Sequence, residues 1–325
     1  MNRLLWLCLF VIVILGGLLY LLATNLRAEA IASADTTLAA RARLISDMVD
    51  HTLQWRMAEA FTFAALPSLR GYAASDDAAR PSRIAAALVE LKAIVAADQS
   101  IRAVSIVDPS GAVSLTTDSS MNANWGSRVF VREALAGHLY ASPPSRDGGQ
   151  VSQYYSAPII DNAGDVAAEL VLRVSAQELW DALGNLPEAI LVDEEGVRIV
   201  DRSRSPQTFA ALVPLASDVA ARVLLDKRYG VEVTQVSATR LVALAEAIKR
   251  SNMAALSYQN VDGRTVRAAT RQAAIQPWTV VVFQDEDDLI SPVRDALIGA
   301  GGVSAAALMV GVLFGAAIRR PGRAN

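Results

Sequence analysis

The sequence predicts an α+β protein in which a long N-terminal helix and two modules with antiparallel sheets lie between two membrane-spanning helices. Three observations predict this fold. Uncharged apolar runs stand near both ends of the 325-residue chain. A helical period follows the first run, and a strand–turn–strand pattern occurs twice in the central segment.

Both apolar runs are long enough to cross a bilayer. Leu4 to Ala23 comprises 20 residues without a charge, and Ala296 to Ile318 comprises 23, whereas a spanning helix needs about 20 residues. The flanking basic residues are Arg3, Arg319, Arg320 and Arg323. Because short arginine-rich ends stay in the cytoplasm, both termini are expected there, with residues 24–295 extracytoplasmic. The sequence therefore predicts a two-span protein of a bacterial-type inner (plasma) membrane.

The first run could instead belong to a signal peptide, with Ala28-Glu29-Ala30 as the cleavage site. Its apolar stretch exceeds the roughly 7–15 residues of a signal-peptide core. We therefore expect an uncleaved anchor.

The composition of the central segment excludes several classes of function. Once the four cytoplasmic arginines are set aside, it holds 26 basic and 33 acidic residues, a net charge of −7, whereas nucleic-acid binding needs a basic face. The only cysteine, Cys8, lies in the first span, so no disulfide is expected outside. No phosphate-binding loop, nucleophile elbow or dinucleotide-binding glycine pattern occurs. We expect no enzyme activity, no cofactor and no metal site.

Helical periodicity continues beyond the first span. Apolar residues recur there at intervals of three and four, namely Ile45, Met48, Val49, Leu53, Met57, Phe61 and Ala64. Pro67 ends this pattern. A second helix is expected to begin at Pro81, since proline is favoured in a first turn. Its predicted buried stripe is Ile84, Leu88, Leu91 and Val95.

From residue 102 the period changes to that of strands. Strands are expected at 102–107, 112–117, 151–160 and 166–174, with a short helix at 128–136 that Gly137 ends. The tetrapeptide Ser175-Ala176-Gln177-Glu178 has the form of a capping box and predicts a helix to Leu183.

The pattern of the segment Ile106 to Gly111 is repeated 85 residues later in Leu191 to Gly196. Each is an apolar strand that turns over Asp-x-x-Gly into another strand. A hairpin at Asp262-Gly263 and a final strand, Trp278 to Gln284, follow. The predicted segments are a transmembrane helix (1–25), two extracytoplasmic helices (26–100), a membrane-distal module (101–185), a membrane-proximal module (186–290), a second transmembrane helix (296–318) and a short cytoplasmic tail (319–325).

The segment Trp125 to Gly137, with Arg-x-Phe followed by Ala-Leu-x-Gly, is similar to a helix motif of double Cache extracytoplasmic sensor domains. The likeness continues at Tyr154 to Ile159 and at the strand 166–174. The run from Arg128 to Arg173 most resembles the sensor regions of dicarboxylate-sensing histidine kinases and chemoreceptors. This resemblance implies a long helix rising from the membrane, two stacked PAS-like modules, and a ligand pocket in the membrane-distal one.

The resemblance places Arg128 and Phe130 at ligand-contacting positions of the helix, and Tyr154 or Ser156 on the strand beneath. An arginine grips a carboxylate through two parallel hydrogen bonds, although an arginine at a helix start is more often a solvated surface charge. Tyr154 and Ser156 alternate onto one face and Tyr155 onto the other. One tyrosine is therefore expected in the core and the other in the pocket.

Two further aromatic residues are expected near the pocket. Trp125 could be a hydrophobic plug or a lid, and we expect a lid. Tyr140 follows the helix on a segment that is expected to cover the site, whereas the nearby His138 is expected to be incidental.

Arg173 departs from the family pattern. Amino-acid-sensing relatives place an aspartate near the end of the last strand to bind the ligand's amine, and here that position is Arg173. Two guanidinium groups without a matching aspartate would suit two carboxylates, so dicarboxylates are expected to bind better than amino acids. In the alternative, Arg173 is structural and pairs with Glu169, which alternation places on the same face of the strand.

The acidic run Asp285-Glu286-Asp287-Asp288 lacks the spacing of a calcium loop. It is expected to begin a helix, where acidic residues complement the helix dipole.

These observations predict a sensor that binds a small organic anion, a carboxylate, and passes a conformational bias into its membrane helices. The first module is expected to bind and the second mainly to transmit. Because seven residues follow the second span, the expected partner is a separate signalling membrane protein or a second copy of the chain, and Gly311-x-x-x-Gly315 is a close-packing motif. Two alternatives stay open: a non-sensing assembly subunit, and a truncated receptor or kinase without its output domain.

Overall fold

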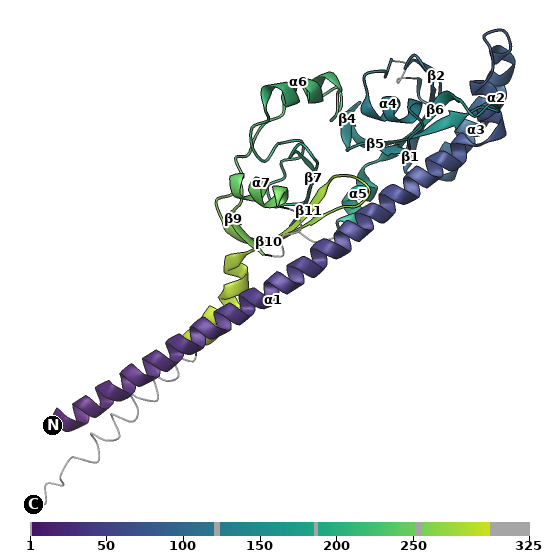
Figure 1. Ribbon diagram of the computed structural model, residues 1–325. Helices are drawn as coiled ribbons and strands as arrows, with labels where there is room; N and C mark the ends of the chain where they lie inside the picture. Colours follow the sequence, from purple (N-terminus) through teal and green to yellow (C-terminus); the bar gives the residue numbers. More distant parts are fainter. Residues whose placement is uncertain (1, 120–123, 185–187, 251–254, 300–325) are drawn as a thin grey trace, which may run out of the picture.

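The computed structural model describes residues 2–119, 124–184, 188–250 and 255–299. They form a long helix and two antiparallel sheets (Figure 1), which confirms the predicted α+β class. The helices are α1 (Asn2–Ala64), α2 (Pro67–Ala73), α3 (Arg80–Ala97), α4 (Val129–Leu135), α5 (Gln177–Ala182), α6 (Ser217–Leu225) and α7 (Val242–Lys249). Residues 286–299 are also helical.

Helix α1 runs beneath both sheets in Figure 1 and packs against strands of each. Its buried side chains recur at helical spacing and belong to the main hydrophobic core, among them Leu38, Ile45, Val49 and Leu53. Both sheets therefore share one rigid support. The helix ends before Pro67, as predicted, and that proline then begins α2.

Helix α3 begins with Pro81 in its first turn, as predicted, but its buried stripe differs from the prediction. The buried side chains are Ala87, Leu91 and Ile94, whereas Ile84 is exposed. Leu88 and Val95 are half-buried. The prediction followed the largest apolar residues, but the small Ala87 lies on the buried face of the helix.

The first sheet contains β1 (Ile101–Val107), β2 (Val113–Thr116), β3 (Tyr140–Ala141), β4 (Ser145–Asp147), β5 (Gln150–Ile160) and β6 (Val166–Ser175). Its order is β2-β1-β6-β5-β3, and β4 pairs with the other end of β5. Strands β3 and β4 are too short to give a period-2 pattern, so the sequence did not indicate them. They lie beside β5, where the candidate site is found.

The second sheet contains β7 (Ala189–Val192), β8 (Arg198–Asp201), β9 (Leu256–Gln259), β10 (Thr265–Gln272) and β11 (Thr279–Asp285). Its order, β8-β7-β11-β10-β9, repeats the order of the first sheet. The repeated turns also match: the Asp108 carboxylate accepts hydrogen bonds from the amides of residues 110 and 112, and the Asp193 carboxylate from those of residues 195 and 197. The predicted internal repeat is thus a repeat of topology.

The predicted capping box is wrong. The amide of Gln177 lies 3.4 Å from Ser175 Oγ, but Ala176 occupies the N-cap position. Glu178 turns instead to Arg56 of α1, because a buried guanidinium offers a stronger partner than a backbone amide.

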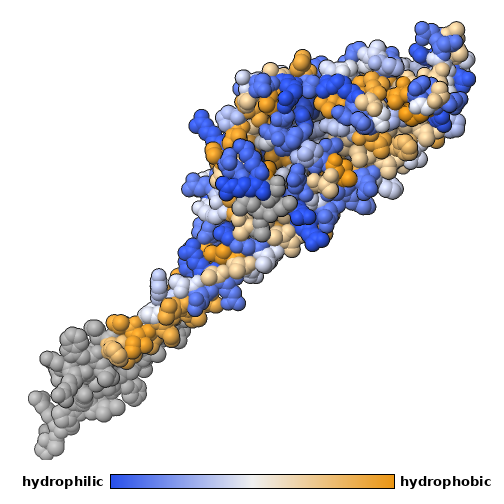
Figure 2. Space-filling view, viewed as in Figure 1, coloured by the Kyte–Doolittle hydropathy of each residue, from blue (hydrophilic) through white to orange (hydrophobic). Residues whose placement is uncertain are grey.

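Helix α1 contains a stretch that is long and apolar enough to cross a membrane. Its apolar side chains, including Phe10, Leu18 and Tyr20, are exposed, and Figure 2 shows apolar residues gathered along this lower part of the molecule. The second predicted span, Ala296 to Ile318, lies outside the described residues except for 296–299. The helix 286–299 begins beside α1, where Arg27 Nη2 and Glu286 Oε1 are 3.1 Å apart.

Candidate functional site

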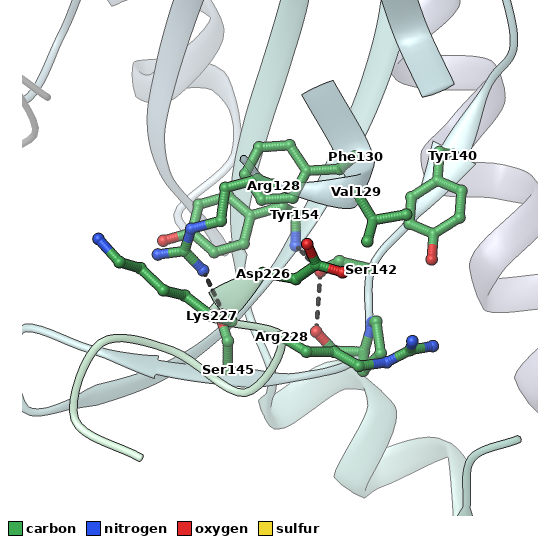
Figure 3. A pocket seen from close by; sticks show the side chains of 11 residues that line it. Arg128, Val129, Phe130, Tyr140, Ser142, Ser145, Tyr154, Asp226, Lys227 and Arg228 are labelled. Atoms are coloured by element: carbon green, nitrogen blue, oxygen red, sulfur yellow. Dashed lines mark hydrogen bonds between the residues drawn. The ribbon is translucent and has the colours of Figure 1, made fainter. Parts of the chain in front are cut away.

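A small cavity lies on the face of the first sheet opposite the one that packs on α1, and Figure 3 shows the side chains that line it. Its volume is about 10 Å³, enough for about one water molecule. The lining residues come from α4, from β3 to β4, from β5 and from the chain after α6: Arg128, Val129, Phe130, Tyr140, Ser142, Pro143, Ser145, Tyr154, Asp226, Lys227 and Arg228. Of the predicted site residues, Arg128, Phe130, Tyr140 and Tyr154 line this cavity.

Aromatic rings form one wall of the cavity. The Phe130 and Tyr154 rings are stacked with centroids 4.8 Å apart. Trp125 meets both rings edge-on, at 5.9 Å and 6.0 Å. Trp125 is buried behind the other two rings and does not line the cavity, so its position is that of a hydrophobic plug and not the expected lid.

Arg128 occupies the N-cap position of α4 and is only 7% exposed. It is therefore not a solvated surface charge. Its Nη1 donates to the carbonyl oxygen of Lys227 at 2.7 Å, and its Nη2 donates to Asp147 Oδ1 at 3.2 Å. The guanidinium thus joins α4 to two segments that lie far from it in sequence.

The Asp147 carboxylate accepts hydrogen bonds from four donors. Oδ1 receives those of Arg128 and the Val231 amide, the latter at 2.9 Å. Oδ2 receives those of the Tyr154 hydroxyl at 3.0 Å and Ser145 Oγ at 3.1 Å. Burial by itself raises the pKa of this carboxyl, but the Arg128 charge and the donated hydrogen bonds outweigh it, so the pKa lies below its usual value.

Arg173 also makes hydrogen bonds to the segment that contains Asp147. Its Nη2 donates to the Asp147 carbonyl oxygen at 2.7 Å and its Nε to Ser152 Oγ at 3.1 Å. Its Nη1 lies 3.5 Å from Asp118 Oδ2. Two expectations are therefore wrong. Arg173 does not line the cavity, where the second guanidinium is that of Arg228, and the site does contain aspartates, because Asp226 lines the cavity and Asp147 binds Arg128.

The alternative partner of Arg173, Glu169, is not hydrogen-bonded to it. Both Glu169 carboxyl oxygens are buried without a hydrogen-bond partner among the described residues. The two residues share a face, as alternation predicted, but four residues of strand separate them by about 13 Å. Burial raises the pKa of Glu169 to about 9, so the carboxyl is neutral at pH 7.

The two tyrosines of β5 separate as predicted. Tyr154 faces the cavity, whereas Tyr155 packs in the main core. Ser156 shares the face of Tyr154, but its Oγ donates to the Phe130 carbonyl oxygen at 2.8 Å, so it fastens α4 to the sheet and does not line the cavity. Tyr140 does line it, and burial raises the pKa of its hydroxyl.

The chain after α6 closes the site and was not predicted to do so. The Tyr229 carbonyl oxygen accepts from the Arg146 amide at 2.8 Å, and the Val231 amide reaches Asp147. Gly230 has φ +100°, and a Cβ there would collide with the Arg146 carbonyl. We call residues 226–232 the closing loop. In the sequence, the glycine at position 230 is the one feature that indicates a close approach between this loop and another backbone segment.

The described residues contain no group of histidine, cysteine and acidic side chains that could hold a metal ion. In the acidic run, Asp285 ends β11 and residues 286–288 begin a helix, which is the arrangement predicted. Chemically, the cavity offers the guanidinium groups of Arg128 and Arg228, the ammonium group of Lys227, hydroxyl groups and stacked rings, together with one carboxylate, that of Asp226. These groups suit binding of a small anion.

No family model and no curated protein match this sequence. Solved structures do match. The sensor domain of the Vibrio cholerae histidine kinase DctB is 14% identical, with a TM-score of 0.63, over 78% of this chain and 98% of that one. The sensory domain of the Campylobacter jejuni chemoreceptor Tlp3 with isoleucine bound is 14% identical, with a TM-score of 0.54, over 82% and 97%. The extracellular domain of the putative histidine kinase rpHK1S-Z16 is 15% identical, with a TM-score of 0.55, over 80% and 98%.

At identities of 14–15% these likenesses establish the fold. They extend along nearly the whole length of each sensor domain, and they agree with the long helix and the two sheets of the same strand order. The chain has the fold of the double Cache type of sensor domain.

Proposed function

We propose that the chain is a membrane-anchored extracytoplasmic sensor that binds a small organic carboxylate beside Arg128. One observation carries this proposal: the site already holds a carboxylate, that of Asp147, with four donors directed at it. A ligand carboxylate can use the same donors. The similar Tlp3 domains have been solved with isoleucine and with L-valine bound, and both ligands carry a carboxylate.

Competition between the ligand and Asp147 provides a route for the signal. A cavity of about 10 Å³ does not admit an organic acid as it stands. If the ligand carboxylate displaces Asp147 from Arg128, the hydrogen bond from Val231 is lost too, which removes one of the bonds that hold the closing loop to the first sheet. The closing loop belongs to the half of the chain that leads to the helix 286–299, so binding is coupled to the membrane side.

The two arms of the test use succinate and L-valine. We expect Arg128→Ala to weaken binding of the true ligand about tenfold to a hundredfold, because a hydrogen bond to a charged group contributes roughly 1.5–3 kcal/mol. Asp147→Asn should tighten succinate binding because it removes the competing charge. If the ligand is an amino acid, the same substitution should weaken valine binding, because the ammonium loses its partner.

The measurement is isothermal titration calorimetry of the full chain in detergent, with Arg43→Ala, an exposed position of α1, as the matched control. An unchanged affinity in Arg128→Ala would show that the ligand binds elsewhere. A chain that binds none of acetate, succinate, valine and isoleucine would contradict the small-carboxylate proposal.

We also propose that two copies pack along α1. Leu44 and Trp55 are each 61% exposed, and Met48 is exposed between them. Spacings of four and seven residues place all three on one face of the helix, as in a coiled-coil seam. Because both copies are anchored in one membrane, the paired helices would be parallel.

Disulfide cross-linking in membranes tests this pairing. In a Cys8→Ser background, Met48→Cys should give a covalent dimer, and adding Trp55→Asp should abolish it. Arg43→Cys, on a different face of the helix, is the control. Equal cross-linking at positions 43 and 48 would contradict a defined interface.

A further inference from the structure

A second cavity lies in the second half of the chain, about 20 Å³ in volume, the space of one or two water molecules. Its walls come from β7, β8, the β9–β10 hairpin, β11 and the chain before α7. The lining residues are Glu188, Ile190, Arg198, Ser203, Arg204, Leu241, Tyr258, Asn260, Val261, Asp262, Arg264 and Phe283.

Arg198 is the unusual member of this lining. It is only 2% exposed, and its Nη1 donates to Asp201 Oδ2 at 2.9 Å. Its Nε and Nη2 find no hydrogen-bond acceptor among the described residues. A buried cationic donor without a partner is costly, and burial accordingly lowers the pKa of Arg198 despite Asp201.

A second donor in the same cavity is also without a partner. Ser203 Oγ is buried and makes no hydrogen bond to the described residues. The other charged groups of the lining are largely paired with one another: Arg204 lies 3.2 Å from Glu188 and from Asp285, and Arg264 contacts Asp285. The unused donors are therefore those of Arg198 and Ser203.

The position of this cavity in its sheet corresponds to that of the first cavity. The strand orders are the same, and Val107 and Val192, at corresponding positions of the repeat, pack beside the first and the second cavity respectively. The opposite faces of both sheets contribute to the core around α1. The repeat thus places a cavity on the corresponding face of each sheet.

We propose that this second cavity, once widened beyond its present volume of about 20 Å³, is a separate site for the carboxylate group of a small organic monoanion. The Nε–H and one Nη2–H of an arginine point in the same direction along one edge of the guanidinium, which is the edge that binds a carboxylate through two parallel bonds. In Arg198 both of these donors are unused, and the Ser203 hydroxyl lines the same space. This site does not depend on the site at Arg128.

The test uses sodium acetate, compared with sodium chloride at equal ionic strength, and the thermal unfolding of the full chain in detergent. The background variant is Arg128→Ala, so that the first site does not contribute. We expect acetate to raise the unfolding temperature of this variant, since a ligand of the folded state stabilises it. Adding Arg198→Lys, which keeps the charge and loses the fork, should weaken the acetate affinity about tenfold or more.

Ser203→Ala provides a second test that leaves the buried ion pair intact. It should weaken the acetate affinity several-fold, whereas Arg43→Lys should leave it unchanged. An acetate effect that is lost in Arg128→Ala alone would place all binding at the first site and overturn the second. An acetate effect that persists equally in Arg198→Lys and Ser203→Ala would also overturn it.

Discussion

Replacing Arg56 by leucine should lower the free energy of unfolding by about 3 kcal/mol, the lower end of the range for breaking a buried ion pair. Arg56 is buried on α1 and contacts three acidic side chains. Its Nε donates to Glu178 at 2.8 Å, its Nη1 to Asp98 at 2.8 Å, and its Nη2 to Ser100 at 2.5 Å. The lower end applies because the acidic side chains keep some exposure.

This cluster connects three elements that are far apart in sequence. Glu178 belongs to α5, Asp98 follows α3, and Arg56 belongs to the helix that supports both sheets. Loss of the guanidinium leaves three carboxylates close together. Urea unfolding of the full chain in detergent, followed by tryptophan fluorescence, measures the effect.

Arg43→Leu, an exposed substitution on the same helix, is the matched control and should change stability by about 0.5 kcal/mol or less. If Arg56→Leu and Arg43→Leu change the free energy of unfolding equally, the ion pairs of Arg56 do not contribute to stability.

Replacing Glu169 by glutamine should raise the free energy of unfolding at pH 8 by several kcal/mol and remove a pH dependence. The pKa of Glu169 is about 9 in the folded chain against 4.5 for an ordinary glutamate. Between these values the unfolded state has released a proton that the folded state keeps. Stability therefore falls as pH rises, by about 1.4 kcal/mol per pH unit.

The contribution of Glu169 is fully present below pH 4.5 and is lost as pH rises towards 9. Between pH 6 and pH 8 the unmodified chain should lose about 2–3 kcal/mol through this group. Glu169→Gln should not lose it, because the amide does not titrate. The exposed Glu246→Gln is the control.

Urea unfolding at pH 6, 7 and 8 measures how the free energy of unfolding changes with pH in the unmodified chain, in Glu169→Gln and in Glu246→Gln. If Glu169→Gln and the unmodified chain show the same slope, the carboxyl is ionised in the folded state and has a partner or water beside it.

The elements with strong local signals were predictable from the sequence. The apolar period along α1, the prolines at 67 and 81, and the Asp-x-x-Gly turns each specify backbone geometry within a few residues. The faces of Tyr154 and Tyr155 followed from strand alternation alone. The resemblance at residues 125–137 then pointed to the cavity, and four of the seven predicted site residues line it.

The missed features depend on contacts between distant segments. Asp147 lies on a three-residue strand, and its donors at positions 128, 154 and 231 come together only in the fold. In the sequence Glu178 fits the pattern of a capping box, but in the fold its carboxylate binds Arg56 of α1. The unused donors of Arg198 have no signature in the sequence, because burial and missing partners are properties of the structure.

The central claim is that a small carboxylate binds beside Arg128 and moves the closing loop. Hydrogen–deuterium exchange of the full chain, with and without a ligand that calorimetry has shown to bind, tests it most directly. The account predicts altered amide exchange both in residues 128–156 and in residues 226–232, with both changes lost in Arg128→Ala. Altered exchange confined to residues 189–213 and 256–283, with no change around Arg128, would contradict it.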